Sequence, residues 1–326
     1  MIDKSIFLEF TYRRISGYNP FTTAELESLL QKRATYFTLM VGFNYNTAYA
    51  KLHDLSLTGE RRPEEVVELG EKILFGGYAG QLGDEVWNVY EQVLIAALDT
   101  GRFDLAKKCL DKLQPRFPKS LRVKRLEGMS LEAEGKLEEA YTLYSDILTE
   151  DPTNILAVKR QIAIQKARGS ITEAIQSLTK YLDIHCNDTE AWLELCALYL
   201  DQFMYQQAAF CLEEVILMQP LNHLFHLKYA EVLFTMDNIP MALKEFCHVI
   251  ELCTDHVRGL YGVKACTGRL LKSGPGSSSR GTNGNTKRLS ELDVMASERL
   301  LNIYSKSKSS ASSQMKRVIE AWLTSQ

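Results

Sequence analysis

Cysteine and histidine side chains gather near residue 250, where their spacing could hold a metal ion. Cys253 and His256 form a Cys-x-x-His pair, and Cys247 and His248 precede them. These residue types bind zinc, which takes four ligands in a tetrahedron. All four residues would lie on one predicted helix and its end, however, and a tetrahedral site needs ligands from a second segment. We therefore interpret them as structural residues and expect no metal and no cofactor.

Motifs that support catalysis are also missing from the sequence. Residues 76–83 (GGYAGQLG) are rich in glycine, but they follow a predicted helix instead of a strand, and no Gly-Lys-Ser/Thr comes after them. The sequence contains no Gly-x-Ser-x-Gly and no His-Glu-x-x-His, the patterns of a nucleophile elbow and of a zinc protease. We therefore expect no catalytic residues and interpret the chain as a binding protein.

The elements that carry these residues repeat along the chain. Alanine recurs every 34 residues, with a turn position five residues before it and bulky apolar residues three before and four after. A 34-residue unit of helix, turn and helix is typical of the tetratricopeptide repeat. The alanines are Ala106, Ala140, Ala174, Ala208 and Ala242, and the turn positions are Gly101, Gly135, Gly169, Phe203 and Asp237.

Each position in this unit has a physical reason. Alanine allows the second helix of a unit to approach the first closely, and glycine in the turn adopts backbone angles that other residues resist. One repeat cannot bury its own apolar face, so neighbouring repeats stack into a superhelix with a concave wall. We therefore predict an all-α tetratricopeptide-repeat superhelix, an α-solenoid of about five to six helix-turn-helix repeats with a C-terminal helical cap.

The pattern divides the chain into four regions. We assign residues 61–272 to the solenoid and residues 289–326 to the C-terminal helical cap. Residues 273–288 (SGPGSSSRGTNGNTKR) lack apolar surface and predict a disordered linker. Residues 1–60 carry no 34-residue register and form a poorly defined N-terminal extension, in which residues 23–32 predict a short helix.

Composition narrows the classes of partner. The chain of 326 residues has a net charge of −3, which argues against nucleic acid because phosphate binding needs a strong basic excess. The N-terminus lacks the pattern of a signal peptide, and no apolar run approaches the length of about 20 residues that spans a membrane. The seven cysteines have no paired spacing, which favours reduced thiols in the cytosol.

The candidate partner-binding surface is the concave groove, which the first helix of each repeat lines. Apolar residues there would face water unless a partner or the C-terminal helices cover them. Basic residues there would suit an acidic segment or lipid headgroups, although charged residues also occupy ordinary solvated helix faces. The first repeat presents Asn88, Glu91, Ile95 and Leu98; the candidate partner-binding residues are Arg122, Arg125, Lys159, Lys166, Leu193, Leu200, Leu227 and Phe234.

Four segments go beyond the general repeat pattern. They resemble the family of subunit 2 of the endoplasmic reticulum membrane protein complex, whose members are cytosolic tetratricopeptide proteins. The segments are LGDEVWNVYEQVLIAALDTGRFDLA (82–106), FPKSLRVKRLEGM (117–129), ILTEDPTNILAVKRQIAIQKARG (147–169) and YQQAAFCLEEVILMQPLNHLFHLKYAEV (205–232).

This resemblance implies a non-catalytic scaffold on the cytoplasmic face of the endoplasmic reticulum membrane, peripheral to the bilayer. Its partners would be cytosolic parts of membrane subunits and a soluble subunit of an insertase complex, which inserts tail-anchored and multipass membrane proteins. The alternative is a soluble tetratricopeptide co-chaperone or adaptor for apolar clients. A complex subunit would co-purify stoichiometrically with membrane proteins in detergent, whereas an adaptor would bind its clients transiently.

Overall fold

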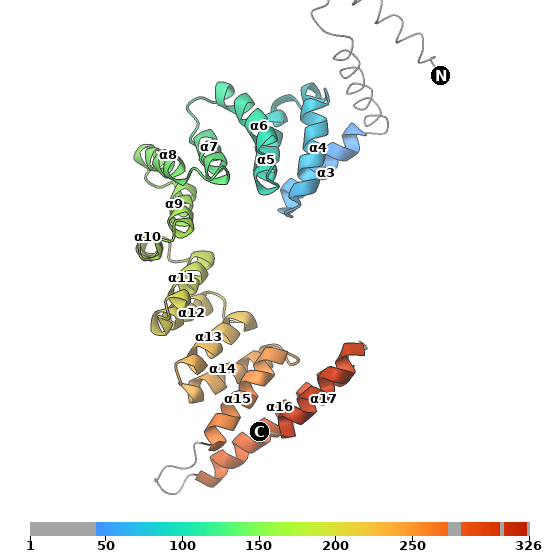
Figure 1. Ribbon diagram of the computed structural model, residues 1–326, viewed down its shortest axis with the longest axis vertical. Helices are drawn as coiled ribbons and strands as arrows, with labels where there is room; N and C mark the ends of the chain where they lie inside the picture. Colours follow the sequence, from blue (N-terminus) through green and yellow to red (C-terminus); the bar gives the residue numbers. More distant parts are fainter. Residues whose placement is uncertain (1–43, 273–281, 307–309, 325–326) are drawn as a thin grey trace, which may run out of the picture. The chain divides into compact units, whose positions relative to one another are not determined.

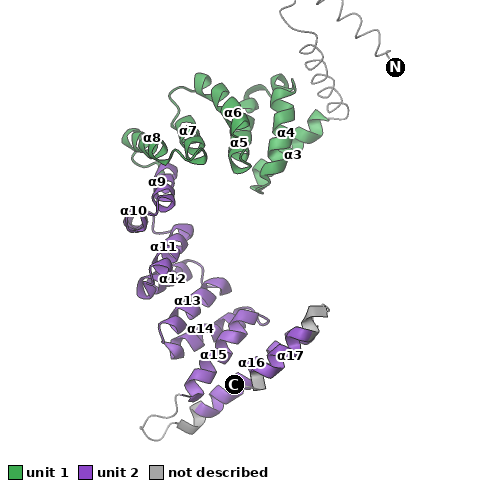
Figure 2. Ribbon diagram, in the orientation of Figure 1, with its two compact units in different colours: residues 1–154 green, residues 155–326 purple. Residues whose placement is uncertain are grey.

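The computed structural model describes residues 44–272, 282–306 and 310–324, and the regular elements in these ranges are all helices (Figure 1). The predicted all-α fold is therefore confirmed. The chain divides into two compact units, Met1–Asn154 and Ile155–Gln326 (Figure 2). Each unit is built from helical hairpins that pack in the order of the chain.

In unit 1, three helical hairpins follow one another within the described residues. Two short 3₁₀ turns, Ala79–Gln81 and Gly83–Glu85, connect the first hairpin to the second. The helices are α3 (Tyr45–Thr58), α4 (Pro63–Phe75), α5 (Val86–Asp99), α6 (Phe103–Arg116), α7 (Leu121–Ala133) and α8 (Leu137–Glu150).

Unit 2 continues the alternation and ends in two C-terminal helices. We refer to the first helix of each repeat (α5, α7, α9, α11, α13, α15) as an A helix and to its successor as a B helix. The helices of unit 2 are α9 (Ile155–Ala167), α10 (Ile171–Ile184), α11 (Thr189–Asp201), α12 (Tyr205–Met218), α13 (His223–Thr235), α14 (Ile239–Leu252), α15 (Val257–Lys272), α16 (Thr282–Lys306) and α17 (Ser310–Thr324).

The 34-residue register corresponds to buried alanines and to turns between the helices, as the sequence predicted. Each of the five register alanines lies on a B helix and is at most 1% exposed. All five turn positions have a positive φ, including the two that are not glycine, Phe203 at 58° and Asp237 at 61°. Side chains with a β-carbon rarely adopt this conformation. The turn geometry is therefore set by the repeat and not by the residue at that position.

Close helix packing also explains the glycine on α7. A β-carbon at Gly128 would lie 2.6 Å from Cζ of Tyr144 on α8. Tyr144 is fully buried, and its hydroxyl donates a hydrogen bond of 2.6 Å to Oε1 of Glu132. Because the hydrogen bond and the surrounding core fix the ring of Tyr144, a β-carbon at position 128 would clash with it, which explains the glycine there.

The N-terminal boundary of the helical array differs from the sequence pattern. Residues 45–58, within the predicted extension, form α3, and the Asn44 side chain accepts hydrogen bonds from the backbone N–H groups of Asn46 and Thr47 at its start. Leu52 and Leu55 are buried in the core of unit 1. The predicted helix at residues 23–32 lies outside the described residues.

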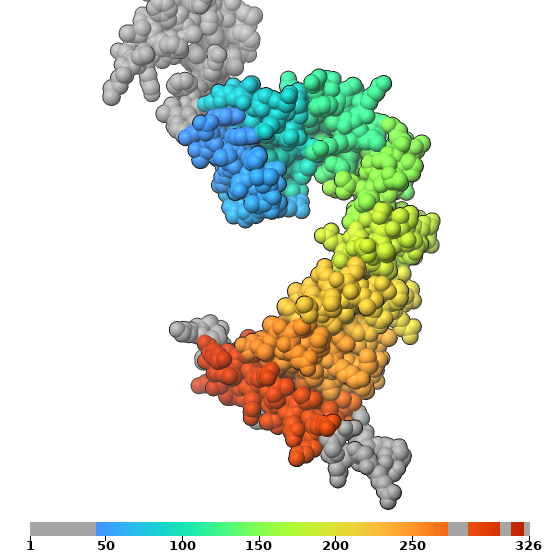
Figure 3. Space-filling model, turned by 180° about the vertical axis from the view of Figure 1, so that it is seen from behind, coloured from blue at the N-terminus to red at the C-terminus, as the bar shows by residue number. Residues whose placement is uncertain are grey.

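Of the two C-terminal helices, α16 packs against α15, and α17 packs mainly against α16. Asp293 on α16 accepts hydrogen bonds from Lys264 and Thr267 of α15, at 2.6 and 2.8 Å. The rings of Tyr261 on α15 and Trp322 on α17 lie 5.6 Å apart. In the space-filling view, the red C-terminal helices lie against the orange helices of unit 2 (Figure 3). Helix α16 begins at Thr282, so it starts earlier than the apolar pattern indicated, and the rest of the predicted linker lies outside the described residues.

Candidate functional site

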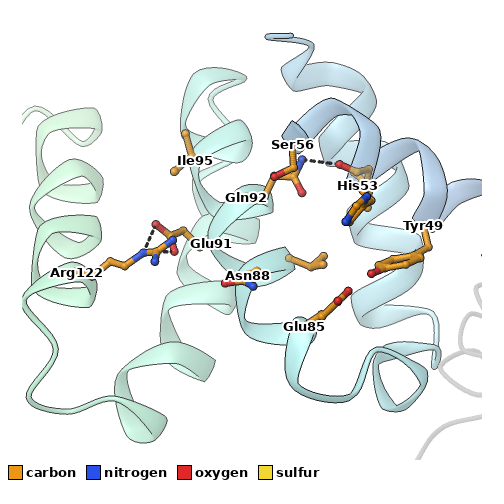
Figure 4. A pocket seen from close by; sticks show the side chains of 11 residues that line it. Tyr49, His53, Ser56, Glu85, Asn88, Glu91, Gln92, Ile95 and Arg122 are labelled. Atoms are coloured by element: carbon orange, nitrogen blue, oxygen red, sulfur yellow. Dashed lines mark hydrogen bonds and ion pairs between the residues drawn. The ribbon is translucent and has the colours of Figure 1, made fainter. Parts of the chain in front are cut away.

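The A-helix face of unit 1 contains an open cavity of about 530 Å³. Helices α3, α5 and α7 surround it, and side chains from all three point toward it (Figure 4). Asn88, Glu91 and Ile95 of α5 line the cavity, so three of the four groove positions predicted for the first repeat lie together. Tyr49 of α3 also lines it, which the sequence did not indicate because α3 lies outside the 34-residue register.

An ion pair and an amide contact connect the three helices of this cavity. Nε of Arg122 on α7 lies 2.7 Å from Oε2 of Glu91 on α5, and Arg125 lies 3.7 Å from the other oxygen. The amide of Gln92 on α5 donates a hydrogen bond of 3.2 Å to the carbonyl oxygen of Leu52 on α3. The Glu91 side chain is only 14% exposed, and its charge is neutralised mainly by Arg122 and Arg125 within unit 1.

Further polar groups line the cavity. They include His53, Ser56 and Glu85. The exposed amide of Asn88 offers both a donor and an acceptor to a bound chain.

On the A-helix face of unit 2, Lys159 of α9 pairs with Asp188, the N-cap residue of α11. Their side chains approach to 2.6 Å, and Asp188 also accepts hydrogen bonds from the Tyr181 hydroxyl at 2.7 Å and from the Ala191 N–H at 3.1 Å. Burial raises the pKa of Asp188, but these donors, with Lys159 first, outweigh it and hold the pKa below its usual value. Burial and the bond to Asp188 raise the pKa of Tyr181 to about 12.

All four basic residues predicted for the groove make ion pairs with a neighbouring repeat. Arg122 and Arg125 share Glu91 in unit 1, Lys159 binds Asp188 in unit 2, and Lys166 of α9 lies 2.5 Å from Glu194 of α11. Two of the four residues belong to each unit. The sequence analysis placed these cations and Glu91 on the A-helix face, but it did not predict the ion pairs or name Asp188 and Glu194.

Three of the four predicted apolar residues are half-buried, and one belongs to the core. Leu193 and Leu200 pack against the core of α11 and α12 while keeping part of their surface open. Phe234 of α13 is covered in part by Arg269 of α15, whose guanidinium lies 4.4 Å from the ring centre. Leu227, however, is only 3% exposed. The expectation that Leu227 faces the groove is corrected, because its position on α13 points into the core.

The cysteine and histidine residues near residue 250 do not gather around one point. Among the described residues, no three His, Cys, Asp or Glu side chains are placed to hold a metal ion. His248 instead lies with its ring 4.6 Å from that of His226. His226 is buried and bonds through Nδ1 to Glu245 at 2.8 Å and through Nε2 to the Pro220 carbonyl at 2.9 Å.

The buried thiols are also unsuited to nucleophilic chemistry. All seven cysteines are free, and four of them are buried. Burial raises the pKa of Cys109, Cys211 and Cys266 to about 12, which keeps these thiols protonated at neutral pH.

In the described part of the chain, none of the helices combines the length and the apolar character needed to span a bilayer.

Comparisons with known proteins show where this architecture and sequence recur. The family model of the EMC2 TPR-like repeat domain matches residues 117–256. The Xenopus laevis protein named ER membrane protein complex subunit 2-A is 43% identical over 230 residues, covering 70% of this chain and 77% of the relative. The Schizosaccharomyces pombe TPR repeat protein oca3 is 37% identical over 218 residues, covering 65% of this chain and 77% of the relative.

A solved structure supports the fold at lower sequence similarity. The crystal structure of the C-terminal part of a TPR repeat-containing protein from Cytophaga hutchinsonii matches with a TM-score of 0.53 and 15% identity. The match covers 81% of this chain and 97% of that chain. At this identity the likeness shows the shared tetratricopeptide architecture alone.

Proposed function

This chain belongs to the family of ER membrane protein complex subunit 2, and we propose that it acts as a non-catalytic scaffold subunit of that complex. In this role it would lie on the cytoplasmic face of the endoplasmic reticulum membrane, peripheral to the bilayer. It would support the insertion of tail-anchored and multipass membrane proteins by holding other subunits in place. The observation that carries the proposal is the 43% identity to the Xenopus laevis subunit over 230 residues.

The chemistry of the A-helix face supports a scaffold. The charged side chains there pair with one another across repeats, so they stiffen the stack and are not arranged as an acid and a base. Stacked repeats depend on such contacts between nearest neighbours for their stability. A rigid stack presents partner-binding side chains at fixed spacing, which is what a scaffold requires.

Partner segments would dock on the A-helix face of each unit. In unit 1 the cavity of about 530 Å³ with the exposed Asn88 amide is the proposed contact. In unit 2 the open parts of Leu193, Leu200 and Phe234 provide apolar contacts beside the Lys159 and Lys166 ion pairs. The partners proposed are cytosolic parts of membrane subunits and a soluble subunit.

Affinity purification of the tagged chain from detergent-solubilised membranes tests this function. We expect membrane subunits to co-purify in a fixed stoichiometry with the tagged chain. Recovery of the chain in the soluble fraction without membrane proteins would instead support the adaptor alternative and overturn the proposal.

A variant of the cavity separates its role from that of the fold. Asn88→Arg places a large cation in the cavity mouth at an exposed position, so we expect normal helix content and reduced recovery of partner subunits. The control is Lys112→Glu, which changes an exposed residue on the B helix α6 and should assemble normally. Full assembly of Asn88→Arg would show that partners bind elsewhere.

A further inference from the structure

The outer face of unit 2 carries a second open groove, formed by B helices. Its walls are α10 and α12, and side chains of α11 form its floor. The groove has a volume of about 640 Å³, within the range of about 300–1,000 Å³ that ligand-binding clefts occupy. Its walls are B helices, and its floor uses residues of α11 other than Leu193 and Leu200, so it is a separate surface from the A-helix face proposed above.

Aromatic side chains provide the main apolar surface of the groove. Nε1 of Trp192 donates a hydrogen bond of 2.8 Å to the Cys186 carbonyl, which satisfies the only polar atom of the indole. The Trp192 ring meets the Phe210 ring edge to face, with centres 6.0 Å apart. Phe210 is 53% exposed, and Leu217, two helical turns further along the same side of α12, is 75% exposed. Phe210 and Trp192 in the groove and Leu217 beyond its end therefore leave apolar surface open, and apolar patches of this kind mark protein-binding sites when they are contiguous.

The charges at the groove have one sign. Asp183 of α10 and Glu214 of α12 line opposite walls, and no lysine or arginine is among the lining residues. Fixed charges of one sign beside an apolar surface select a partner of the opposite charge. The occupant must therefore combine apolar side chains with flanking cations.

We propose that this groove binds an amphipathic helix of a partner protein, whose apolar side chains cover Trp192 and Phe210 and whose lysine or arginine side chains pair with Asp183 and Glu214. An apolar stripe set into a groove is a recurring mode of helix recognition. Helix α12 has 14 residues, so its wall is about 21 Å long and matches about four turns of a partner helix.

Two model peptides test the charge and the apolar contacts separately. Both are labelled helical peptides of about 14 residues with the same leucine stripe, one with lysine and one with glutamate at the polar positions. Their binding to the full 326-residue chain is measured by fluorescence anisotropy. We expect the lysine peptide to bind at least tenfold more tightly than the glutamate peptide.

Variants of the chain locate the binding. Phe210→Ala should weaken binding of the lysine peptide by tenfold or more, and Leu217→Ser is a second variant at a more exposed position. Asp183→Asn combined with Glu214→Gln should weaken it by about fivefold, since exposed ion pairs contribute little each. The control, Asp104→Asn combined with Glu139→Gln, removes the same charge from exposed positions of unit 1 and should bind normally.

Three outcomes would overturn the proposal. Equal binding of the two peptides would remove the role of charge. Unchanged affinity in both Phe210→Ala and Leu217→Ser, with normal helix content, would place the peptide elsewhere. Self-association of the wild-type chain in sedimentation equilibrium that Leu217→Ser abolishes would assign the groove to a second copy of this chain. Loss of complex assembly by the Asn88→Arg variant affects none of these results.

Discussion

The register alanine of the fourth repeat provides a direct test of the helix packing. Ala208 on α12 is completely buried, as is Cys196 on the facing helix α11. Leucine in place of Ala208 adds three carbon atoms to the core that contains both residues. We expect Ala208→Leu to destabilise the protein, because neither helix can move without disturbing the next repeat in the stack.

The expected magnitude follows from the available space. If the site had room, burying three methylene-sized groups would stabilise the fold by about 2.4 kcal/mol. Because both Ala208 and Cys196 are fully buried, we expect overpacking instead, which costs about 1–3 kcal/mol. At about 2–4 °C per kcal/mol for a chain of this size, the unfolding temperature should fall by about 2–12 °C.

Thermal and urea unfolding, followed by far-UV circular dichroism, measure this effect. The matched control is Ala197→Leu on α11, where the alanine is exposed. Alanine and leucine are both strong helix formers, so the control should change stability by less than about 0.5 kcal/mol. Equal unfolding midpoints for Ala208→Leu and Ala197→Leu would refute the packing argument, and a raised midpoint for Ala208→Leu would show an unfilled cavity.

Two further substitutions test the turn and the cap. Phe203→Gly should stabilise the protein by about 1 kcal/mol in urea unfolding, because glycine adopts a φ of 58° without strain; Phe203→Ala keeps the β-carbon, and an equal gain there would contradict this cause. Asp188→Ala should cost about 0.5–2 kcal/mol at pH 7 through loss of the helix cap. Since the pKa of Asp188 is lowered in the fold, its contribution is present above the unfolded value of about 3.9 and is lost as pH falls below it. A difference between Asp188→Ala and wild type that stays constant down to pH 2 would exclude the charge of Asp188 as its source.

The repeat architecture could be predicted because its rules act within one repeat. A register alanine must be small wherever two helices touch, so the sequence shows it at a fixed interval. The turn position was predicted even at Phe203 and Asp237, which are not glycine, because the register of the neighbouring residues locates the turn. The assignment to the subunit family also followed from sequence segments and agrees with the comparisons.

The ends of the array were harder to predict because the interval changes there. The two 3₁₀ turns between residues 79 and 85 lengthen the connection from α4 to α5, so α3 and α4 fall out of the 34-residue register. At the other end, the first turns of α16 contain few apolar residues. The residues that anchor α16, including Ala296 and Leu300, lie in its later turns and are buried, so the apolar pattern marks those turns and not the start of the helix at Thr282.

The charged residues of the A-helix face could not be interpreted from one repeat alone, because each pairs with a residue of the neighbouring repeat. Arg122 pairs with Glu91 across 31 residues, Lys166 with Glu194 across 28, and Arg258 with Glu231 across 27. Each separation is about one repeat less one or two helical turns, which is where a parallel neighbouring helix brings side chains together. Cations that look like a basic patch along the sequence therefore become contacts between repeats. Charge reversal at Arg122 would consequently weaken the contact between α7 and α5, so a loss of partner binding in that variant would not by itself identify Arg122 as a partner contact.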